Sequence, residues 1–297
     1  MRIFITGGTG FIGRHLCRQW LAEGHEIRVL SRQRPERVVS LCGPVRAAQR
    51  LEEMGEPEVV VNLAGEPILG PRWTARRKAA IWESRVTLTS RLVAHLGGLE
   101  APPKVLLSGS AVGYYGDRGD QVLTESSPPG RDFGAELCVA WEEVALEAER
   151  FGVRVCLLRT GPVLGAGGGM LARMLPPFRL GLGGPLGSGR QWLAWIHLQD
   201  HLAAIRYLVD HQTLEGPFNL VAPEPVTNRQ LARTLGKVLG RPALLPVPAS
   251  VLRLLLGEQA EILLASQRTL PQRLLEAGFS FRYPQLEAAL RQVLAGD

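Results

Sequence analysis

The stretch Met1-Arg-Ile-Phe-Ile-Thr-Gly-Gly-Thr-Gly-Phe-Ile-Gly13 decides the fold that the sequence predicts. Residues 2–6 are apolar and rich in β-forming side chains, which predicts a short buried strand. Glycines follow at positions 7, 8, 10 and 13, and residues 14–22 then carry apolar side chains at helical spacing. A strand, a glycine turn and a helix in this order are typical of the first unit of a parallel α/β sheet.

The glycine turn fits the G-x-G-x-x-G pattern of dinucleotide-binding proteins, as Gly8-Thr-Gly10-Phe-Ile-Gly13. The second glycine of this pattern lets the backbone approach a pyrophosphate, and the third lets the helix pack closely on the strand. The helix N-terminus offers N–H groups to the phosphates. We therefore expect cofactor contacts from Gly7, Thr9, Gly10, Phe11, Ile12 and Gly13. The alternative is an ordinary strand-to-helix turn.

The end of the second predicted strand, residues 25–30, indicates which dinucleotide binds. An acidic residue here would bond the adenosine ribose and favour NAD. The sequence instead continues Ser31-Arg32, and no acid appears before Glu36. A guanidinium beside a hydroxyl suits a 2′-phosphate, so the predicted cofactor is NADP(H). The alternative for Arg32 is a solvated loop charge.

Two further strands are expected to end at the same edge of the sheet. The first, from residue 58, runs into Leu63, Ala64 and Gly65, whose small residues would let a cofactor lie against the backbone. A helix over residues 75–96 follows, from which Arg85 could reach back to the cofactor, although a surface charge is the default interpretation. The second strand, from residue 104, leads to Ser110, where substrate and nicotinamide are expected to meet.

These motifs, with Ser110-Ala-Val-Gly-Tyr-Tyr-Gly116, Arg159-Thr-Gly-Pro-Val-Leu-Gly165 and Trp195-Ile-His-Leu-Gln-Asp200, resemble the extended short-chain dehydrogenase/reductases. Residues 181–189, 218–223 and 271–279 are similar to the YfcH-like group within them, usually labelled "epimerase family protein". The resemblance runs from residue 1 to about 295. It implies an α/β fold with a Rossmann-type doubly wound parallel sheet over residues 1–160. Residues 161–297 would mainly form a smaller substrate lobe, with segments returning to the sheet. It also adds Val163 to the expected cofactor contacts.

The helix after the serine strand departs from that family. Its members carry Tyr-x-x-x-Lys there, where the lysine lowers the tyrosine pKa and the tyrosine relays a proton. Here Phe133 occupies the tyrosine position and Leu137 the lysine position. In one hypothesis the protein is an NADP-dependent oxidoreductase or epimerase in which Ser110 bonds the reacting oxygen and Tyr115 or Tyr114 supplies the proton. These tyrosines could equally be structural packing. In the other hypothesis the chain binds NADPH without turnover, as a sensor or scaffold.

Composition bounds the partners and the location. The net charge is +6, and the arginines are spread along the chain without a basic stripe, so we expect no nucleic-acid partner. We also expect no membrane span, because long apolar runs are absent, and no targeting segment before the first strand. Four scattered cysteines and no clustered histidines indicate no metal site and a cytoplasmic location. A small-molecule substrate, anionic or sugar-like, is expected. The sequence predicts no oligomeric state.

Overall fold

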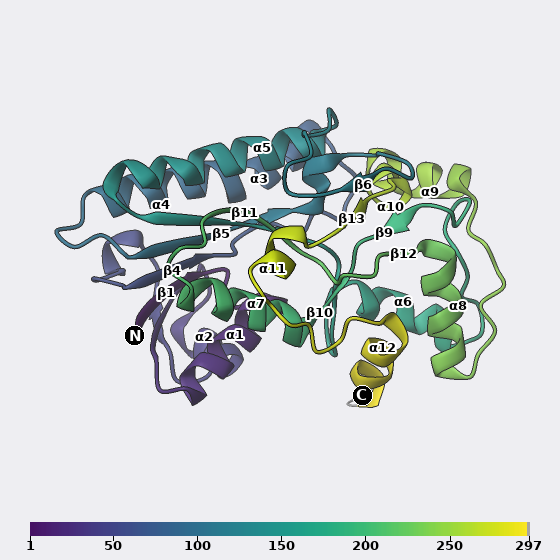
Figure 1. The fold of residues 1–297 in the computed structure, drawn as a ribbon, viewed down its shortest axis with the longest axis horizontal. Helices are drawn as coiled ribbons and strands as arrows, with labels where there is room; N and C mark the ends of the chain where they lie inside the picture. The colour runs from purple at the N-terminus through teal and green to yellow at the C-terminus, as the bar shows by residue number, and fades with distance from the viewer. Residues whose placement is uncertain (296–297) are drawn as a thin grey trace.

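The computed structural model describes residues 1–295 and is organised around a seven-stranded parallel sheet (Figure 1). Every pairing in this sheet is parallel. The strands lie in the order β11 (Gly216–Leu220), β7 (Arg154–Thr160), β5 (Val105–Ala111), β4 (Val59–Asn62), β1 (Arg2–Thr6), β2 (Glu26–Leu30) and β3 (Arg46–Ala48). Because the chain moves outward from β1 in both directions, the sheet is doubly wound, which confirms the predicted α/β fold class.

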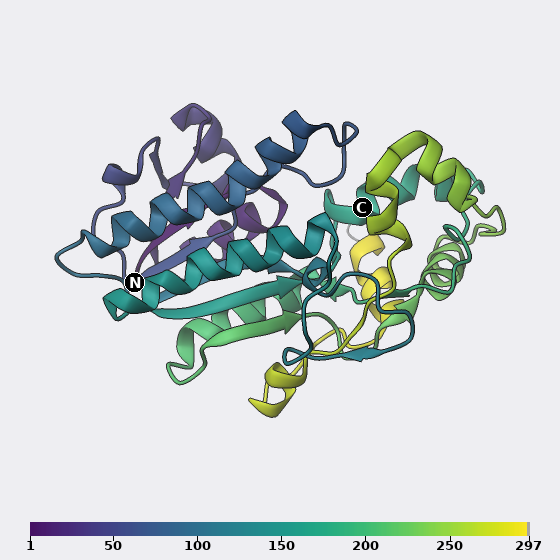
Figure 2. The same ribbon diagram turned by 90° about the horizontal axis from the view of Figure 1, so that it is seen from above.

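Helices cover both faces of this sheet because its strands alternate buried side chains between two cores. In β1, Ile3 and Ile5 join one core and Phe4 joins the other. The first core is closed by α1 (Phe11–Ala22), α2 (Pro35–Cys42) and α7 (Leu198–Asp210). The opposite face carries α3 (Ala75–Trp82), α4 (Leu88–Gly97) and α5 (Phe133–Leu146) (Figures 1 and 2).

Residues 83–87 interrupt the helix that the sequence predicts over residues 75–96. They form a single π-helical turn, η2 (Glu83–Thr87), between α3 and α4. Such turns interrupt the regular i→i−4 ladder and are frequent at functional sites. This one carries Arg85, and its position decides where that side chain points.

The C-terminal half contributes to the sheet and also forms a separate cluster of helices. Strand β11 and helix α7 pack with the N-terminal half. A third core is shared by α6 (Gly169–Arg179), α8 (Asn228–Leu239) and α12 (Leu286–Ala295). Beside it lie β9 (Trp192–Leu193) with β12 (Val226–Thr227), β8 (Val163–Leu164) with β10 (Ile196–His197), α9 (Ala249–Leu256), α10 (Ala260–Leu264) and α11 (Gln272–Glu276).

The segment between β5 and α5 ties the two halves together. Its strand β6 (Val122–Leu123) pairs in parallel with β13 (Arg268–Thr269) of the C-terminal half. The indole N–H of Trp192 donates to Asp120 at 2.8 Å, and the Ser266 N–H donates to Asp117 at 3.1 Å. These bonds hold the C-terminal helices beside the carboxyl ends of the strands. Among residues 1–295, no helix is long and apolar enough to cross a membrane.

Candidate functional site

The turn between β1 and α1 presents backbone N–H groups at the carboxyl edge of the sheet. Gly7 has a φ of +70°, and the Gly10 N–H donates to the Gly7 carbonyl at 3.0 Å, which closes the turn. Gly10 is the N-cap of α1 and has no side chain to cap it. The N–H groups of Phe11, Ile12 and Gly13 therefore remain for an anion, and Thr9 lies half-buried beside them.

Gly13 can only be glycine in this arrangement. A Cβ atom built at this residue would lie 2.4 Å from the Gly7 carbonyl oxygen and 2.6 Å from the Gly8 Cα. Both are backbone atoms of the turn, so they cannot move without opening it. The close packing of helix on strand thus depends on this position.

Arg32 and Glu66 meet across the ends of β2 and β4. The Arg32 side chain is 93% exposed, and its Nη2 lies 3.0 Å from a Glu66 carboxylate oxygen. Arg77 of α3 bonds the other oxygen at 3.1 Å. Bonds from Arg32 and then Arg77 hold the pKa of Glu66 below its usual range. The Ser31 hydroxyl accepts from the Gln33 N–H at 3.1 Å. Arg32 therefore has room to bind a second anion.

Arg85 lies directly beside Gly65. A Cβ at Gly65 would be 2.8 Å from the Arg85 Cζ, and Arg85 donates to the Glu66 carbonyl at 2.9 Å. Its guanidinium also lies 5.4 Å from the Trp141 ring. Burial lowers its pKa. The π-helical turn thus brings a cation to the end of β4, beside the half-buried Leu63 and Ala64.

The loop after β7 packs on the start of α1. Cβ atoms at Gly165 and Gly168 would lie 2.9 Å and 2.2 Å from the Phe11 ring. Arg14 donates to the Gly167 carbonyl at 2.8 Å. Val163, at the beginning of this loop, is buried and pairs with Ile196. The structure therefore brings Val163 and the glycine turn to one edge.

A buried network of polar side chains stands at the ends of β5 and β7. Ser110 Oγ donates to Glu142 Oε1 at 2.6 Å. Arg159 binds both Glu142 oxygens, from Nε and Nη2, at 2.8 Å each. The exposed fractions of Ser110, Glu142 and Arg159 are 6%, 5% and 4%. We name these three residues, with Tyr115 and Asn219, the Glu142 network.

The sequence interpretation missed Glu142 and the role of Arg159. A signal was present, because Cys138, Glu142 and Ala145 recur at helical spacing along the buried face of α5. An acid on an otherwise apolar helix face needs a buried partner. Which residue provides that partner is visible only in the fold.

The two candidate tyrosines occupy different environments. The Tyr115 side chain is fully buried, and its hydroxyl donates to Asn219 Oδ1 at 2.6 Å and accepts from Arg159 Nη1 at 3.1 Å. Burial raises the pKa of Tyr115 to about 12. Tyr115 is thus packed and hydrogen-bonded within the core, and its assignment as proton donor stays a prediction. Tyr114 is half-buried, and its ring centre lies 3.5 Å from the Arg159 Cζ.

Phe133, at the start of α5, contacts an aromatic ring and a lysine. Its ring packs edge-on against Trp73 at 5.0 Å, and Lys78 Nζ lies 4.8 Å from its centre. Lys78 also bonds Glu258 of the C-terminal half at 2.7 Å. A lysine from α3 is therefore present beside Phe133, at the position of the family's tyrosine, which the sequence did not indicate.

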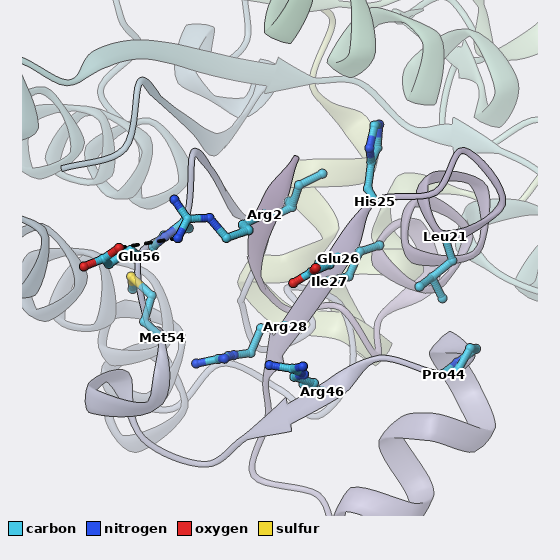
Figure 3. A pocket seen from close by; sticks show the side chains of 12 residues that line it. Arg2, Leu21, His25, Glu26, Ile27, Arg28, Pro44, Arg46, Met54 and Glu56 are labelled. Atoms are coloured by element: carbon cyan, nitrogen blue, oxygen red, sulfur yellow. Dashed lines mark hydrogen bonds and ion pairs between the residues drawn. The ribbon is translucent and has the colours of Figure 1, made fainter. Parts of the chain in front are cut away.

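A hollow of about 210 Å³ lies at the opposite, amino edge of the sheet (Figure 3). Arg2 and Arg46, which begin β1 and β3, line it together with Arg28 of β2, His25 and Glu56. It contains none of the predicted site residues. The candidate site is the carboxyl edge.

Comparisons with known proteins agree with this geometry. Residues 3–220 match the NAD dependent epimerase/dehydratase family, and residues 247–293 match a domain of unknown function, DUF1731. The chain is 42% identical to the Arabidopsis thaliana "Epimerase family protein SDR39U1 homolog, chloroplastic", over 99% of this chain and 87% of that protein. It is 40% identical to the Mus musculus protein SDR39U1, over 99% and 100%.

A similar solved structure is that of human epimerase family protein SDR39U1 (isoform 2), crystallised with NADPH. It has a TM-score of 0.91 and 35% identity, and the match covers 100% of both chains. A nucleoside-diphosphate sugar epimerase from Corynebacterium glutamicum has a TM-score of 0.79 and 34% identity, over 100% of this chain and 59% of that one. The chain therefore belongs to the NAD dependent epimerase/dehydratase family, as an atypical extended short-chain dehydrogenase/reductase without the Tyr-x-x-x-Lys pair.

Proposed function

We propose that this chain binds NADP(H) along the carboxyl edge of its sheet. The observation that carries the proposal is the glycine turn with free N–H groups on α1, next to a β2 end that holds Ser31 and Arg32 and no acid. The first feature suits a pyrophosphate and the second a 2′-phosphate. NADPH bound to the human relative supports the same cofactor.

The residues at this edge can be matched to successive parts of the cofactor. Gly10, Phe11, Ile12 and Gly13 would hold the pyrophosphate through their N–H groups, and Arg32 would hold the 2′-phosphate. Leu63, Ala64, Gly65, Arg85 and Val163 would line the remainder. Bound NADP(H) supplies or accepts a hydride.

We further propose that the reaction is an NADP(H)-dependent oxidoreduction, alone or as a step of an epimerisation. The substrate would be a small alcohol or carbonyl compound, sugar-like or anionic. Ser110 supports this assignment, because it stands at the end of β5, beside the end of β4 where Arg85 and Gly65 meet. The names of relatives give the sugar-like class, and the arginines near this edge suit an anion.

A second candidate function is favoured by one observation, the replacement of tyrosine and lysine by Phe133 and Leu137. An apolar pair at these positions is what a protein that binds NADPH without turnover would carry. It would then act as a sensor or scaffold. Cytoplasmic location stays a proposal as well, since one relative is named chloroplastic.

The binding proposal is tested by fluorescence titration with NADPH and NADH. Wild type should prefer NADPH, and R32D should weaken NADPH binding by about tenfold or more while leaving NADH unchanged, since a charge-assisted bond contributes about 1.5–3 kcal/mol. R91D, on the exposed face of α4, is the matched control. Equal losses for both nucleotides in R32D would contradict the role of Arg32.

Turnover separates the two candidate functions. A panel of sugar-like and aromatic alcohols and carbonyl compounds would be followed at the nicotinamide absorbance with NADP⁺ and NADPH. Turnover that requires the folded protein supports the enzyme. Tight NADPH binding with no reaction across the panel favours the sensor, and absence of NADPH binding contradicts both.

A further inference from the structure

The residues that flank Ser110 suggest where the missing proton function lies. Ser110 has one hydroxyl proton, and that proton is directed at Glu142 over 2.6 Å. A hydroxyl that donates inward presents only lone pairs to a ligand. In this state Ser110 can accept a proton from a substrate hydroxyl but has none to offer a carbonyl oxygen.

Glu142 is held ready to accept the serine proton. Arg159 donates to both of its oxygens at 2.8 Å, which gives the carboxylate two charge-assisted hydrogen bonds. Cys138 lies one turn earlier on α5, at the i, i+4 spacing that places both side chains on one face of the helix. Helix α5 therefore lacks the tyrosine and lysine but carries an acid against the serine.

The two tyrosines that follow Ser110 are both engaged by neighbouring residues. Tyr115 directs its proton to Asn219 inside the core. Phe133 has no proton to exchange. The remaining candidate, Tyr114, stacks on the Arg159 guanidinium at 3.5 Å.

We propose that Ser110 and Glu142 replace the tyrosine and lysine as the site's proton acceptor, with Glu142 acting through Ser110. The proposal rests on the proposed function, because it assigns the proton transfer of that reaction. It also identifies the ligand group that the site is built to receive, an alcohol hydroxyl together with the oxidised cofactor. Ser110 would be the catalytic residue, and Glu142 a positioning residue that takes up the proton.

The step balances in both directions. The substrate O–H bond breaks as its proton passes to Ser110 Oγ, while the Ser110 proton passes to Glu142 Oε1. The substrate carbon releases its hydrogen as a hydride, which bound NADP⁺ accepts, and a C=O bond forms. In the reduction direction neutral Glu142 returns its proton to Ser110, and Ser110 donates to the oxygen.

The first test uses the protein without cofactor. Infrared difference spectra between wild type and E142Q, recorded at neutral pH, should contain a carboxylate-stretch band that belongs to Glu142. The groups that face this carboxyl are Arg159 of β7, Ser110 of β5, Cys138 of α5 and, through Arg159, Tyr115. The band should shift in S110A, which leaves the Glu142–Arg159 pair in place. No such band in the folded protein, or an identical band in S110A, would overturn the relay.

The second test measures turnover on the best substrate of the panel. E142Q should lower kcat by about 10²–10⁴-fold, the usual contribution of proton transfer, and lose the acidic limb of the pH profile. KM and the NADPH Kd should change by no more than about twofold, because the ground-state contacts stay. S110T should retain more activity than S110A. E143Q, at the exposed neighbouring residue, should behave as wild type.

The outcomes separate this inference from the proposed function. If E142Q folds poorly, S110A gives the same comparison with the buried ion pair intact. A wild-type protein that turns over, with E142Q and S110A unchanged in kcat and pH profile, overturns only the relay. A wild-type protein that binds NADPH and turns over nothing overturns the proposed enzyme and the relay with it.

Discussion

The two ends of the carboxyl edge of the sheet present different kinds of chemical group. At the proposed phosphate end, which comprises Gly7–Gly13, Ser31 and Arg32, the groups available for binding are backbone N–H groups and an exposed guanidinium. At the other end, the Glu142 network consists of buried side chains that satisfy one another. A backbone cradle needs only glycines at fixed positions, whereas a buried side-chain network needs every member.

This difference explains how the chain resembles its family at one end and departs from it at the other. A glycine turn of this kind can accept the phosphates of any dinucleotide, so its pattern is the same wherever such phosphates bind. The chemistry at the end of β5 can be carried by different residues, provided that each buried charge finds a partner. Phe133 and Leu137 remove two polar groups from α5, and Glu142 adds one that Arg159 neutralises.

The largest expected effect is the loss of the Arg159 charge. R159M should lower the free energy of unfolding by about 3–5 kcal/mol, because Glu142 would be left buried and unpaired. In R150M, which removes an exposed ion pair with Glu147, the loss should be about 0–1 kcal/mol. Chemical denaturation of both variants measures the difference. Similar values for the two would mean that the Glu142 network does not carry the stability of this end.

His201 provides a pH test of the same end. Its ring bonds the Thr160 hydroxyl at 3.1 Å, and burial lowers its pKa to about 3. An unfolded histidine titrates near pH 6.5, so in the window between about 3 and 6.5 the unfolded chain binds a proton that the folded chain refuses. The contribution of neutral His201 to the free energy of unfolding is therefore complete above pH 6.5. It is lost as the pH falls, by up to about 1.4 kcal/mol per pH unit.

Substitution isolates the contribution of His201. The unfolding free energy of H201Q should fall less steeply between pH 6.5 and 5 than that of wild type, while the difference between the two proteins should be constant above pH 7. Urea denaturation at fixed pH values provides the measurement. Parallel curves across the whole range would show that His201 takes up its proton as readily in the folded protein as in the unfolded chain.

The fold was predictable because its determinants are local in sequence, and the same local motif predicts the phosphate end. Strand, turn and helix follow one another within residues 2–22, and the strand ends at Asn62 and Ser110 follow from apolar runs. The doubly wound sheet was therefore predicted and is confirmed.

The Glu142 network was beyond prediction for the opposite reason. Glu142 and Arg159 are 17 residues apart, and Tyr115 and Asn219 are 104 apart, so only the folded chain shows that they meet. The sequence also could not predict whether Tyr115 is exposed or buried, because an aromatic residue beside a glycine turn can be either a core residue or a proton donor. The π-helical turn was not predicted either, although it places Arg85.

The phosphate end can be tested at Gly13. G13A should lower the free energy of unfolding by about 1–3 kcal/mol, since its Cβ would meet the Gly7 and Gly8 backbone at 2.4–2.6 Å. The loss of NADPH binding free energy should exceed the loss of unfolding free energy in the cofactor-free protein. The reason is that the displaced turn carries the N–H groups that would bind the phosphates. G98A, where the nearest atom would be 3.6 Å away, is the control. Unchanged NADPH affinity in a folded G13A protein would contradict the cradle.

The smallest expected effect concerns Glu66, which bonds Arg32 at the phosphate end. Its carboxylate occupies Arg32 at 3.0 Å, so a 2′-phosphate at Arg32 would meet a second negative charge close by. E66Q should therefore strengthen NADPH binding by about fivefold, since two charges about 4 Å apart in water interact by about 1 kcal/mol. NADH, which lacks that phosphate, should bind as before. If NADPH binding weakens instead, Glu66 orients Arg32 for the phosphate rather than competing for it, and the phosphate end also depends on a side-chain network.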